Sequence, residues 1–421
     1  MFNKKIAILI ALSSVFYLNY SNIYVKDGFD QPANYKLLKM ALMIAQSFAN
    51  LLENANLAPE YSFIRNAIDY FSISGLNNDD KNFKMEYKIF NDVNVRIYGP
   101  ADKDQILPIM IYIHGGGYFI RNLDSYDKFL FTISKEANLK IISIDYRLAP
   151  EHPFPIPTDD CWNVVEYVLK NAQSLNINPE RLILAGDSAG GNAAMVLSKR
   201  LAKEKNIKPL FQVLIYPWVQ LAFARLPSSI FYKGGLIPTS HVKMKLWYLG
   251  FKEVSEEMIN SISSNNHTLL LNVKEKNLIK SYMDLNLIPD KYKIGKNYYD
   301  LYKNLPLINT GTLDPNNILV RDKNFAEKVK LLFSEEVSPI LASLDQLKYQ
   351  SKTYQIACEW DSLKDEGLIL AERMKQAGVA VEMAFYEDCF HGMVSLLDRN
   401  LGFVYSHKIL KDTINFIKKN I

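Results

Sequence analysis

The sequence predicts an α/β protein in which a mostly parallel central sheet is covered by helices on both faces. Two observations carry this prediction. Apolar strand-like runs alternate with amphipathic helical stretches, and those runs are apolar along nearly their whole length, as is typical of strands buried on both faces. The chain has 421 residues, 48% of them hydrophobic and 22% charged, which excludes a disordered chain. The formal net charge is only +4 without a dense basic block, so nucleic acid is not an expected partner.

Elements can be assigned in chain order from hydrophobic periodicity. Residues 34–73 carry apolar side chains at roughly helical spacing and predict about two helices, and a polar break follows at residues 75–83. Three strand-like runs come next: VNVRIYGP, ILPIMIYIHGGG and LKIISIDYRLAP. A helix, a strand, a second helix and another strand complete this part of the chain: DDCWNVVEYVLKNA, RLILAG, GNAAMVLSKRLAKE and PLFQVLIYP.

The alternation stops after Trp218. Residues 219–336 are irregular, polar and rich in Asn, Lys and Tyr. This segment is too long for a loop in a compact core, so we expect an inserted subdomain there. The strand and helix pattern then resumes with KTYQIACEW, LILAERMKQAG, VAVEMAFYED and HKILKDTINFIKK.

The N-terminus begins with the basic stretch MFNKK and continues as an apolar run from Ile6 to Leu18. Three interpretations fit: a cleaved signal peptide, a signal anchor from Ile6 to Val25, or a buried core helix. No A-x-A-like cleavage site follows the run, and the tyrosines near its end suit a membrane interface, so the anchor is favoured. The lysines before the run then predict residues 1–5 in the cytoplasm and the body of the protein in a lumen.

A serine is the first candidate for chemistry. Ser188 lies in GDSAG, which fits G-x-S-x-G with a predicted strand before it and a predicted helix after it. The turn in this motif is so sharp that the serine is strained, and Gly186 and Gly190 must lack side chains. The strain exposes the hydroxyl at the carboxyl edge of the sheet, facing the helix N-terminus. The pattern predicts a nucleophile, and an ordinary tight turn is the alternative.

Glycines after the strand PIMIYI provide the second signal. His114 to Gly117 spell HGGG, a motif used for oxyanion holes in acyl-transfer enzymes. An oxyanion needs backbone N–H groups that a substrate can approach closely, and consecutive glycines allow this approach. A flexible turn or a phosphate cradle is the alternative, but neither phosphate-binding glycine pattern fits. We interpret His114 and Gly117 as residues that shape the loop.

The base is expected to be a histidine, since this fold orders its catalytic residues Ser, then Asp or Glu, then His. His391 follows the strand VEMAFYED in CFHGM, a loop at the carboxyl end of a strand. His241 and His267 fall in the insert and His407 in the last helix, so we favour His391. An ordinary loop histidine is the alternative.

The acid that orients the base should lie between the serine and His391. Glu359 is still within the strand after KTYQIAC, and Asp365 and Glu366 enter the next helix, where acids favour the first turn anyway. Asp361 sits at the strand–helix junction, from which a carboxylate can reach a loop histidine, so we favour Asp361. Capping of that helix is the alternative role.

Three cysteines, Cys161, Cys358 and Cys389, show no metal-type spacing, and we predict neither a metal site nor a cofactor. At most one internal disulfide can form, and the sequence alone does not say which pair forms it. A thiol nucleophile at Cys389 beside His391 is the less favoured alternative to Ser188, because no oxyanion motif or helix start accompanies it.

Seven short motifs follow one another along the chain: HGGG, DYRLAPEHPFP, NPERL, GDSAGGN, SPILA, DSLKDEG and FHG. Together they resemble the hormone-sensitive lipase-like group of α/β-hydrolases, above all its arylacetamide deacetylase and neutral cholesterol ester hydrolase branch. The similarity covers nearly the whole chain. It is strong over residues 107–218 and 338–392 and weak across the insert.

The resemblance implies an α/β-hydrolase fold and a serine carboxylic ester hydrolase that acts on small lipophilic or lipid esters through an acyl-enzyme. Its catalytic residues would be Ser188, Asp361 and His391. Its oxyanion hole would use the backbone N–H groups of Gly115, Gly116 and Ala189. A catalytically weak lipid- or ligand-binding protein on the same fold is the alternative, and an amidase would differ only in its leaving group.

The resemblance also implies a lid formed by the N-terminal helices with the insert. It further implies a single-pass endoplasmic reticulum membrane protein with a lumenal body, and a secreted protein is the alternative. In a lumen, the sequon that starts at Asn266 is a candidate for glycosylation. The expected organisation is a signal anchor (1–25), N-terminal lid helices (26–82), a first core part (83–218), an inserted lid subdomain (219–336) and a second core part (337–421).

One departure from the family pattern concerns the cysteines. Members of this branch carry a cysteine just after the glycine run, bridged to one near the acid. Cys358 matches the second of these, but Tyr118 and Phe119 follow the glycines in this chain. We therefore expect that bridge to be absent, although a lumenal location would permit it.

Overall fold

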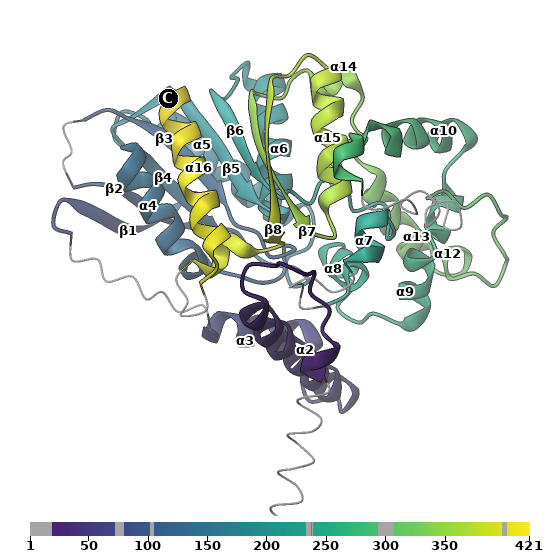
Figure 1. Ribbon diagram of the computed structural model, residues 1–421. Helices are drawn as coiled ribbons and strands as arrows, with labels where there is room; N and C mark the ends of the chain where they lie inside the picture. Colours follow the sequence, from purple (N-terminus) through teal and green to yellow (C-terminus); the bar gives the residue numbers. More distant parts are fainter. Residues whose placement is uncertain are drawn as a thin grey trace, which may run out of the picture.

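The computed structural model of the protein describes residues 19–71, 80–101, 105–232, 237, 239–293, 307–397 and 402–421. An eight-stranded sheet in the order β1-β2-β4-β3-β5-β6-β7-β8 lies at its centre (Figure 1). The strands are β1 (Phe83–Phe90), β2 (Val93–Pro100), β3 (Leu107–Ile113), β4 (Lys140–Asp145), β5 (Ile177–Asp187), β6 (Phe211–Ile215), β7 (Thr353–Trp360) and β8 (Val381–Phe390).

Most of this sheet is parallel. Strands β4, β3, β5, β6, β7 and β8 pair in parallel, whereas β1 with β2 and β2 with β4 are antiparallel. The carboxyl ends of the parallel strands therefore meet at one edge, which is where open α/β sheets bind their ligands. The predicted fold class is confirmed.

Strand β1 is an element that the hydrophobic periodicity does not indicate, and it starts within the predicted polar break. Only its end residues, Phe83 and Phe90, are buried. It lies at the edge of the sheet and pairs with β2, so charged residues between these two ends face solvent. An edge strand of this kind lacks the apolar run that identifies the central strands.

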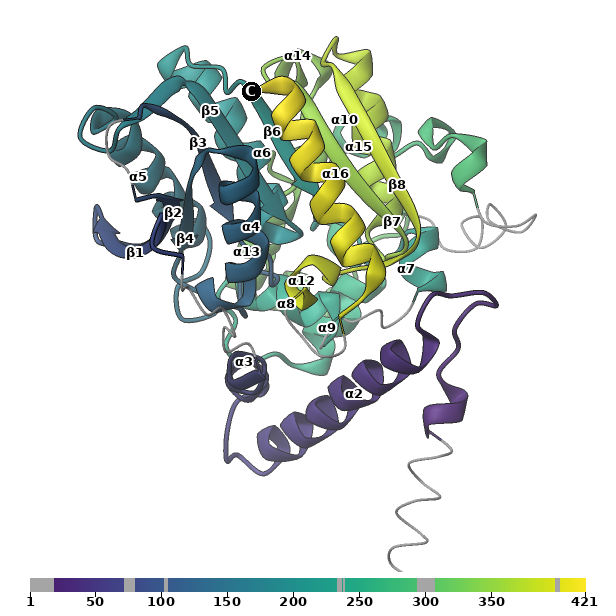
Figure 2. The same cartoon turned by 60° about the vertical axis from the view of Figure 1, so that its left-hand side comes forward.

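Helices cover both faces of the sheet, as predicted. In β3 all side chains are buried, with Ile109, Ile111 and Ile113 in the core cluster of one face and Met110 and Tyr112 in that of the other. This two-sided burial is the physical reason for the continuous apolar run. The helices are α4 (Asp127–Ala137) and α16 (Val404–Asn420) on one face, and α5 (Ile156–Lys170), α6 (Ala189–Arg200) and α15 (Lys364–Gln376) on the other (Figure 2).

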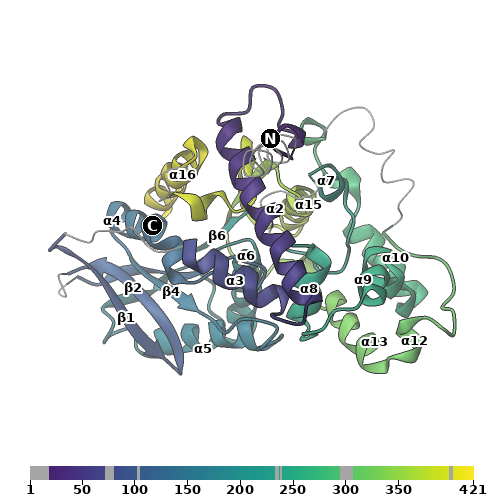
Figure 3. The same cartoon turned by 90° about the horizontal axis from the view of Figure 1, so that it is seen from below.

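The two expected N-terminal helices are α2 (Pro32–Asn54) and α3 (Glu60–Phe71). Pro32 opens α2, where a missing backbone N–H costs no helical hydrogen bond. The helices pack against each other and lie across the carboxyl edge of the sheet (Figure 3). Only three residues of α2 are buried, so this helix covers the site rather than filling the core.

The expected insert, residues 219–336, contains short helices and no strand in its described part. None of the helices in the described ranges is both long and apolar enough to span a bilayer; residues 1–18, which hold most of the predicted anchor, lie outside those ranges. The insert helices are α7 (Pro227–Phe231), α8 (His241–Tyr248), α9 (Glu256–Ser263), α10 (Val273–Tyr282), α12 (Ile318–Arg321) and α13 (Lys323–Lys330), and α14 (Leu344–Leu347) follows them.

Candidate active site

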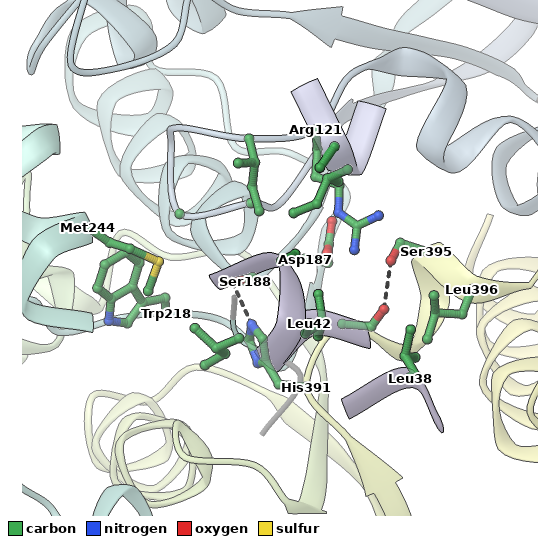
Figure 4. Close-up of a pocket in the computed structure, with 18 of the residues that line it drawn as sticks. Leu38, Leu42, Arg121, Asp187, Ser188, Trp218, Met244, His391, Ser395 and Leu396 are labelled. Carbon is green, nitrogen blue, oxygen red and sulfur yellow. Dashed lines mark hydrogen bonds between the residues drawn. The ribbon is translucent and has the colours of Figure 1, made fainter. Parts of the chain in front are cut away.

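Three strand ends bring the predicted serine, acid and histidine together. Ser188 follows β5, Asp361 follows β7 and His391 follows β8, all at the carboxyl edge of the sheet. The Nε2 atom of His391 lies 2.8 Å from the Oγ atom of Ser188 (Figure 4), and its Nδ1 atom lies 2.9 Å from Oδ2 of Asp361. Residues that are far apart in the sequence thus form one continuous hydrogen-bonded chain.

The turn at Ser188 has the strained geometry that its motif predicts. Ser188 has φ 53° and ψ −121°, in the left-handed half of conformational space that non-glycine residues avoid. A Cβ atom on Gly186 would lie 2.4 Å from the carbonyl of Gly190, and one on Gly190 would lie 1.9 Å from the carbonyl oxygen of Ile113. Both glycines are therefore required, and the serine projects from a backbone that its surroundings hold in place.

The imidazole of His391 is oriented from two sides. Its Nδ1–H donates to Asp361, whose other carboxylate oxygen accepts from the backbone N–H of Leu363 at 2.8 Å. The ring also packs against Tyr216, with 4.9 Å between the ring centroids. With Nδ1 protonated, the neutral ring presents an unprotonated Nε2 to the Ser188 hydroxyl, which is the arrangement a general base requires.

The glycine loop meets the serine, but one predicted role is wrong. The backbone N–H of Gly115 donates to Oδ1 of Asp187 at 2.8 Å, so it is already bonded within the protein and does not serve an oxyanion. Gly116 and Gly117 line the cavity together with Ser188, and in the described part of the chain their N–H groups and that of Ala189 have no protein acceptor. Ala189 opens α6, where backbone N–H groups are left free.

Asp187 ties the glycine loop to the serine turn, a role that the sequence analysis did not assign. Besides the Gly115 N–H, its carboxylate accepts from the hydroxyls of Tyr112 at 2.9 Å and Tyr126 at 3.0 Å. Burial raises the pKa of the Asp187 carboxyl, and these three hydrogen bonds oppose that shift. The one sequence signal for this role is its place directly before Ser188.

The surroundings of His114 agree with its predicted role as a residue that shapes the glycine loop. Its Nδ1–H donates to the Gly115 carbonyl oxygen at 2.7 Å, and its ring stacks on Tyr146 with 4.3 Å between centroids. Complete burial lowers the pKa of His114 to about 4, so the ring is neutral near pH 7. The side chain holds the shape of the glycine loop and makes no hydrogen bond to Ser188.

The remaining histidines differ in position. His241 opens α8 and lines the cavity, a position that its place in the insert did not predict. Burial, with the positive charges of Lys245 and His391, lowers the pKa of His241 to about 3, so its ring is neutral. His267 lies elsewhere and donates from Nε2 to the Ala222 carbonyl oxygen at 2.6 Å. Neither makes a hydrogen bond to Ser188.

The site opens into a cavity of about 340 Å³. The loops at the carboxyl edge of the sheet form most of its wall, α2 and α3 cover it, and the insert contributes little beyond α8. The resemblance predicted both parts as the lid, and near the serine the N-terminal helices form the larger share. The N-terminal helices contribute Leu37, Leu38, Ala41, Leu42, Ala45, Ala67 and Ile68, and α8 contributes His241 and Met244.

One disulfide joins Cys358 in β7 to Cys389 in β8. Its sulfur atoms are therefore bonded, which removes the alternative of a thiol nucleophile at Cys389. Cys161 is buried and free. Among the described residues, no group of three or more His, Cys, Asp or Glu side chains could hold a metal ion.

The predicted sequon lies at the start of a short 3-10 helix in the insert. The Oδ1 atom of Asn266 accepts a hydrogen bond from Asn309 at 2.8 Å, and its Nδ2 atom, which would carry a glycan, is not used by that bond. Thr268 is fully buried and donates to the Asn265 carbonyl oxygen. Glycosylation at Asn266 stays a prediction.

Together these features define a class of protein. A strained serine turn between a strand and a helix, a histidine–aspartate pair on later strands and a glycine loop beside them are the arrangement of α/β hydrolases. The sequence matches the family described as alpha/beta hydrolase fold over residues 110–277 and 306–395, which is more than half of the chain. The protein belongs to this family, in its hormone-sensitive lipase-like group of esterases.

Its similarity to curated relatives extends over most of the chain. It is 30% identical to arylacetamide deacetylase of Oryctolagus cuniculus over 81% of each chain. It is 28% identical to neutral cholesterol ester hydrolase 1 of Mus musculus over 99% of this chain and 98% of that protein.

Solved structures share its fold. An ester hydrolase from the metagenome of Lake Arreo superposes with a TM-score of 0.59 at 21% identity, over 89% of this chain and 97% of the other. A fungal esterase from Rhizomucor miehei gives 0.59 at 22% identity, over 90% and 95%.

Proposed function

We propose that the protein is a serine carboxylic ester hydrolase that acts through an acyl-enzyme intermediate. The observation that carries this proposal is the hydrogen-bonded chain from Ser188 through His391 to Asp361, with 2.8 Å and 2.9 Å between the bonded atoms. Ser188 and His391 line a mainly apolar cavity.

The reaction follows from this geometry. The Oγ atom of Ser188 attacks the ester carbonyl while Nε2 of His391 takes its proton, and Asp361 holds the imidazole in the required tautomer. The free N–H groups of Gly116, Gly117 and Ala189 donate hydrogen bonds to the negatively charged oxygen of the tetrahedral intermediate. His391 then protonates the leaving alcohol, and a water activated by the same nitrogen releases the acid from Ser188.

The substrates we propose are small lipophilic or lipid esters. The cavity wall is mainly aliphatic, and its volume of about 340 Å³ lies at the small end of ligand pockets, which span roughly 300–1,000 Å³. Relatives named arylacetamide deacetylase and neutral cholesterol ester hydrolase support an acyl-transfer reaction on an apolar substrate. An amide substrate would use the same residues.

Labelling with a fluorophosphonate probe tests the mechanism. We expect the wild-type protein to be labelled and to hydrolyse 4-nitrophenyl esters, and Ser188→Ala to lose both properties because no nucleophile remains. Wild-type turnover in the alanine variant would rule out Ser188. The competing proposal, a weakly catalytic ligand-binding protein, predicts lipid binding with neither labelling nor turnover in the wild type.

We further propose that residues 1–25 anchor the protein in the endoplasmic reticulum membrane with its body in the lumen. The apolar run from Ile6 supports this location, as does the disulfide, because disulfides persist in oxidising compartments. Exposed apolar side chains on α2 also suit a membrane surface: Ile44, Phe48 and Leu51.

Carbonate extraction and N-glycosidase digestion test this location. We expect the protein to stay with membranes after extraction and to lose mass after digestion, with Asn266→Gln insensitive to the glycosidase. Recovery of a processed chain in the medium would favour the secreted alternative.

A further inference from the structure

A cationic side chain lines the mainly apolar cavity beside Ser188. Arg121 is part of the lining, and in Figure 4 its guanidinium group points toward the middle of the pocket rather than out of it. The Asp187 carboxylate also lines the cavity, but it already accepts three hydrogen bonds from other groups. Arg121 therefore gives this cavity a polarity that the aliphatic wall does not predict.

The Arg121 guanidinium has no fixed partner. Over the ranges that the structure describes, it makes no hydrogen bond and no ion pair. The neighbouring Arg65 is different, because it binds both oxygens of Glu151 and the carbonyl oxygens of Phe119 and Ala149. A half-buried guanidinium has five N–H donors to satisfy, and a group brought in by a ligand can satisfy them.

The backbone at Arg121 adopts a strained conformation. Arg121 has φ 80°, a region that favours glycine and in which a long side chain costs free energy. Strain of this kind persists mainly at functional sites. The Cγ atom of Arg121 lies 2.9 Å from the place of a Cβ atom on Gly116, so the side chain runs directly over the glycine loop.

The charges near Arg121 leave its guanidinium free for a ligand. Burial raises the pKa of Asp69 on α3, and the positive charge of Arg121 is the largest of the effects that oppose this shift. Oδ1 of Asp69 is buried without a hydrogen-bond partner, and Asp69 and Arg121 form neither a hydrogen bond nor an ion pair with each other. Burial lowers the pKa of His114, and the positive charge of Arg121 lowers it further.

We propose that Arg121 is a specificity-determining residue that binds a carboxylate of the substrate. The preferred substrates would then be esters that are aliphatic around the scissile bond and carry one carboxylate a few atoms away, such as half-esters of short dicarboxylic acids. A guanidinium binds a carboxylate through two parallel hydrogen bonds, and the surrounding apolar wall strengthens that pairing. This inference rests on the proposed esterase function and narrows its substrate class.

Paired substrates test the inference. The mono-4-nitrophenyl ester of glutaric acid and 4-nitrophenyl pentanoate have acyl chains of equal length and differ in the terminal carboxylate. The quantity to measure is the ratio of their kcat/KM values in the wild type, Arg121→Gln and Arg121→Lys. We expect Arg121→Gln to lower the glutarate-to-pentanoate ratio about 10- to 100-fold, mainly through KM, and Arg121→Lys to give an intermediate ratio.

Controls separate this inference from the proposed function. Arg200→Gln, at the far end of α6, is the matched control and should keep the wild-type ratio. Fluorophosphonate labelling of each variant reports a folded site. Turnover of both esters with the same ratio in wild type and Arg121→Gln would overturn the role of Arg121 alone. Absence of labelling and of turnover in the wild type would overturn the esterase proposal and this inference with it.

Discussion

At the scale of single residues, Asp187 fixes the position of the glycine loop relative to the turn that carries Ser188. Its carboxylate binds the Gly115 N–H of the glycine loop while its own backbone precedes Ser188 in the turn. The distance between the nucleophile and the free N–H groups of Gly116 and Gly117 therefore depends on a buried anion. We therefore expect substitution of Asp187 to weaken stabilisation of the transition state while the hydrogen bond between Ser188 and His391 stays intact.

We predict that Asp187→Ala lowers kcat for 4-nitrophenyl esters about 10- to 100-fold, because the glycine loop loses its anchor and an oxyanion donor shifts. Stability should fall as well, by about 1–3 kcal/mol for each buried donor left unpaired. Asp187→Asn keeps one carbonyl oxygen as acceptor and should lose less. Steady-state kinetics and urea unfolding measure both effects, and an alanine variant with wild-type kcat would contradict the anchoring role.

At the scale of elements, β7 and β8 carry the acid and the base just beyond their carboxyl ends. The disulfide between Cys358 and Cys389 joins these strands shortly before Asp361 and His391. The strands are also the last parallel pair of the sheet, so β8 has a hydrogen-bonded neighbour on one side. The cross-link thus restrains the pair of strands on which the imidazole orientation depends.

We predict that the double variant Cys358→Ala/Cys389→Ala unfolds with a free energy lower by about 4 kcal/mol, because the bridge closes a loop with a sequence separation of 31. Denaturant unfolding under non-reducing conditions measures the change. Cys161→Ala is the matched control, since Cys161 is buried but unbridged and loses only the packing of one sulfur atom. Equal losses in the two proteins would show that the bridge adds nothing.

At the scale of the whole molecule, three neutral histidines are buried in separate parts of the fold. Burial lowers the pKa of His114 and of His267 to about 4, and that of His241 to about 3, from an ordinary value of 6.5. Between those values the unfolded chain binds protons that the folded chain does not. The free energy of unfolding therefore rises as the pH increases from about 4 to 6.5. The stability that these neutral histidines contribute is lost as the pH falls from 6.5 toward 4.

We predict that the urea midpoint of unfolding drops steeply when the pH is lowered from 7 to about 4.5. His267→Gln keeps a donor for the Ala222 carbonyl oxygen but cannot titrate, so its stability should depend less on pH. His267 lies away from the cavity, which allows ester turnover to serve as a control for folding. Parallel pH dependences in wild type and variant would contradict a contribution from this histidine.

Much of the candidate site could be predicted because its signals are local. The glycines at 186 and 190 flank Ser188 in one short motif, and steric limits at a sharp turn require them wherever that turn occurs. His391 and Asp361 could be chosen because each follows an apolar strand, and the ends of parallel strands share one edge. The central strands could also be predicted from local sequence, because burial on both faces produces continuous apolar runs.

What only the tertiary structure decided depends on contacts between distant segments. The Gly115 N–H is lost as an oxyanion donor because Asp187 reaches it from another strand. Pairing of Cys358 with Cys389 needs β7 and β8 to be neighbours. Arg121 becomes part of the cavity only when α2 and α3 close over it. The sequence by itself determined the fold class and the reacting groups through local sterics and burial, whereas three-dimensional packing decided what surrounds them.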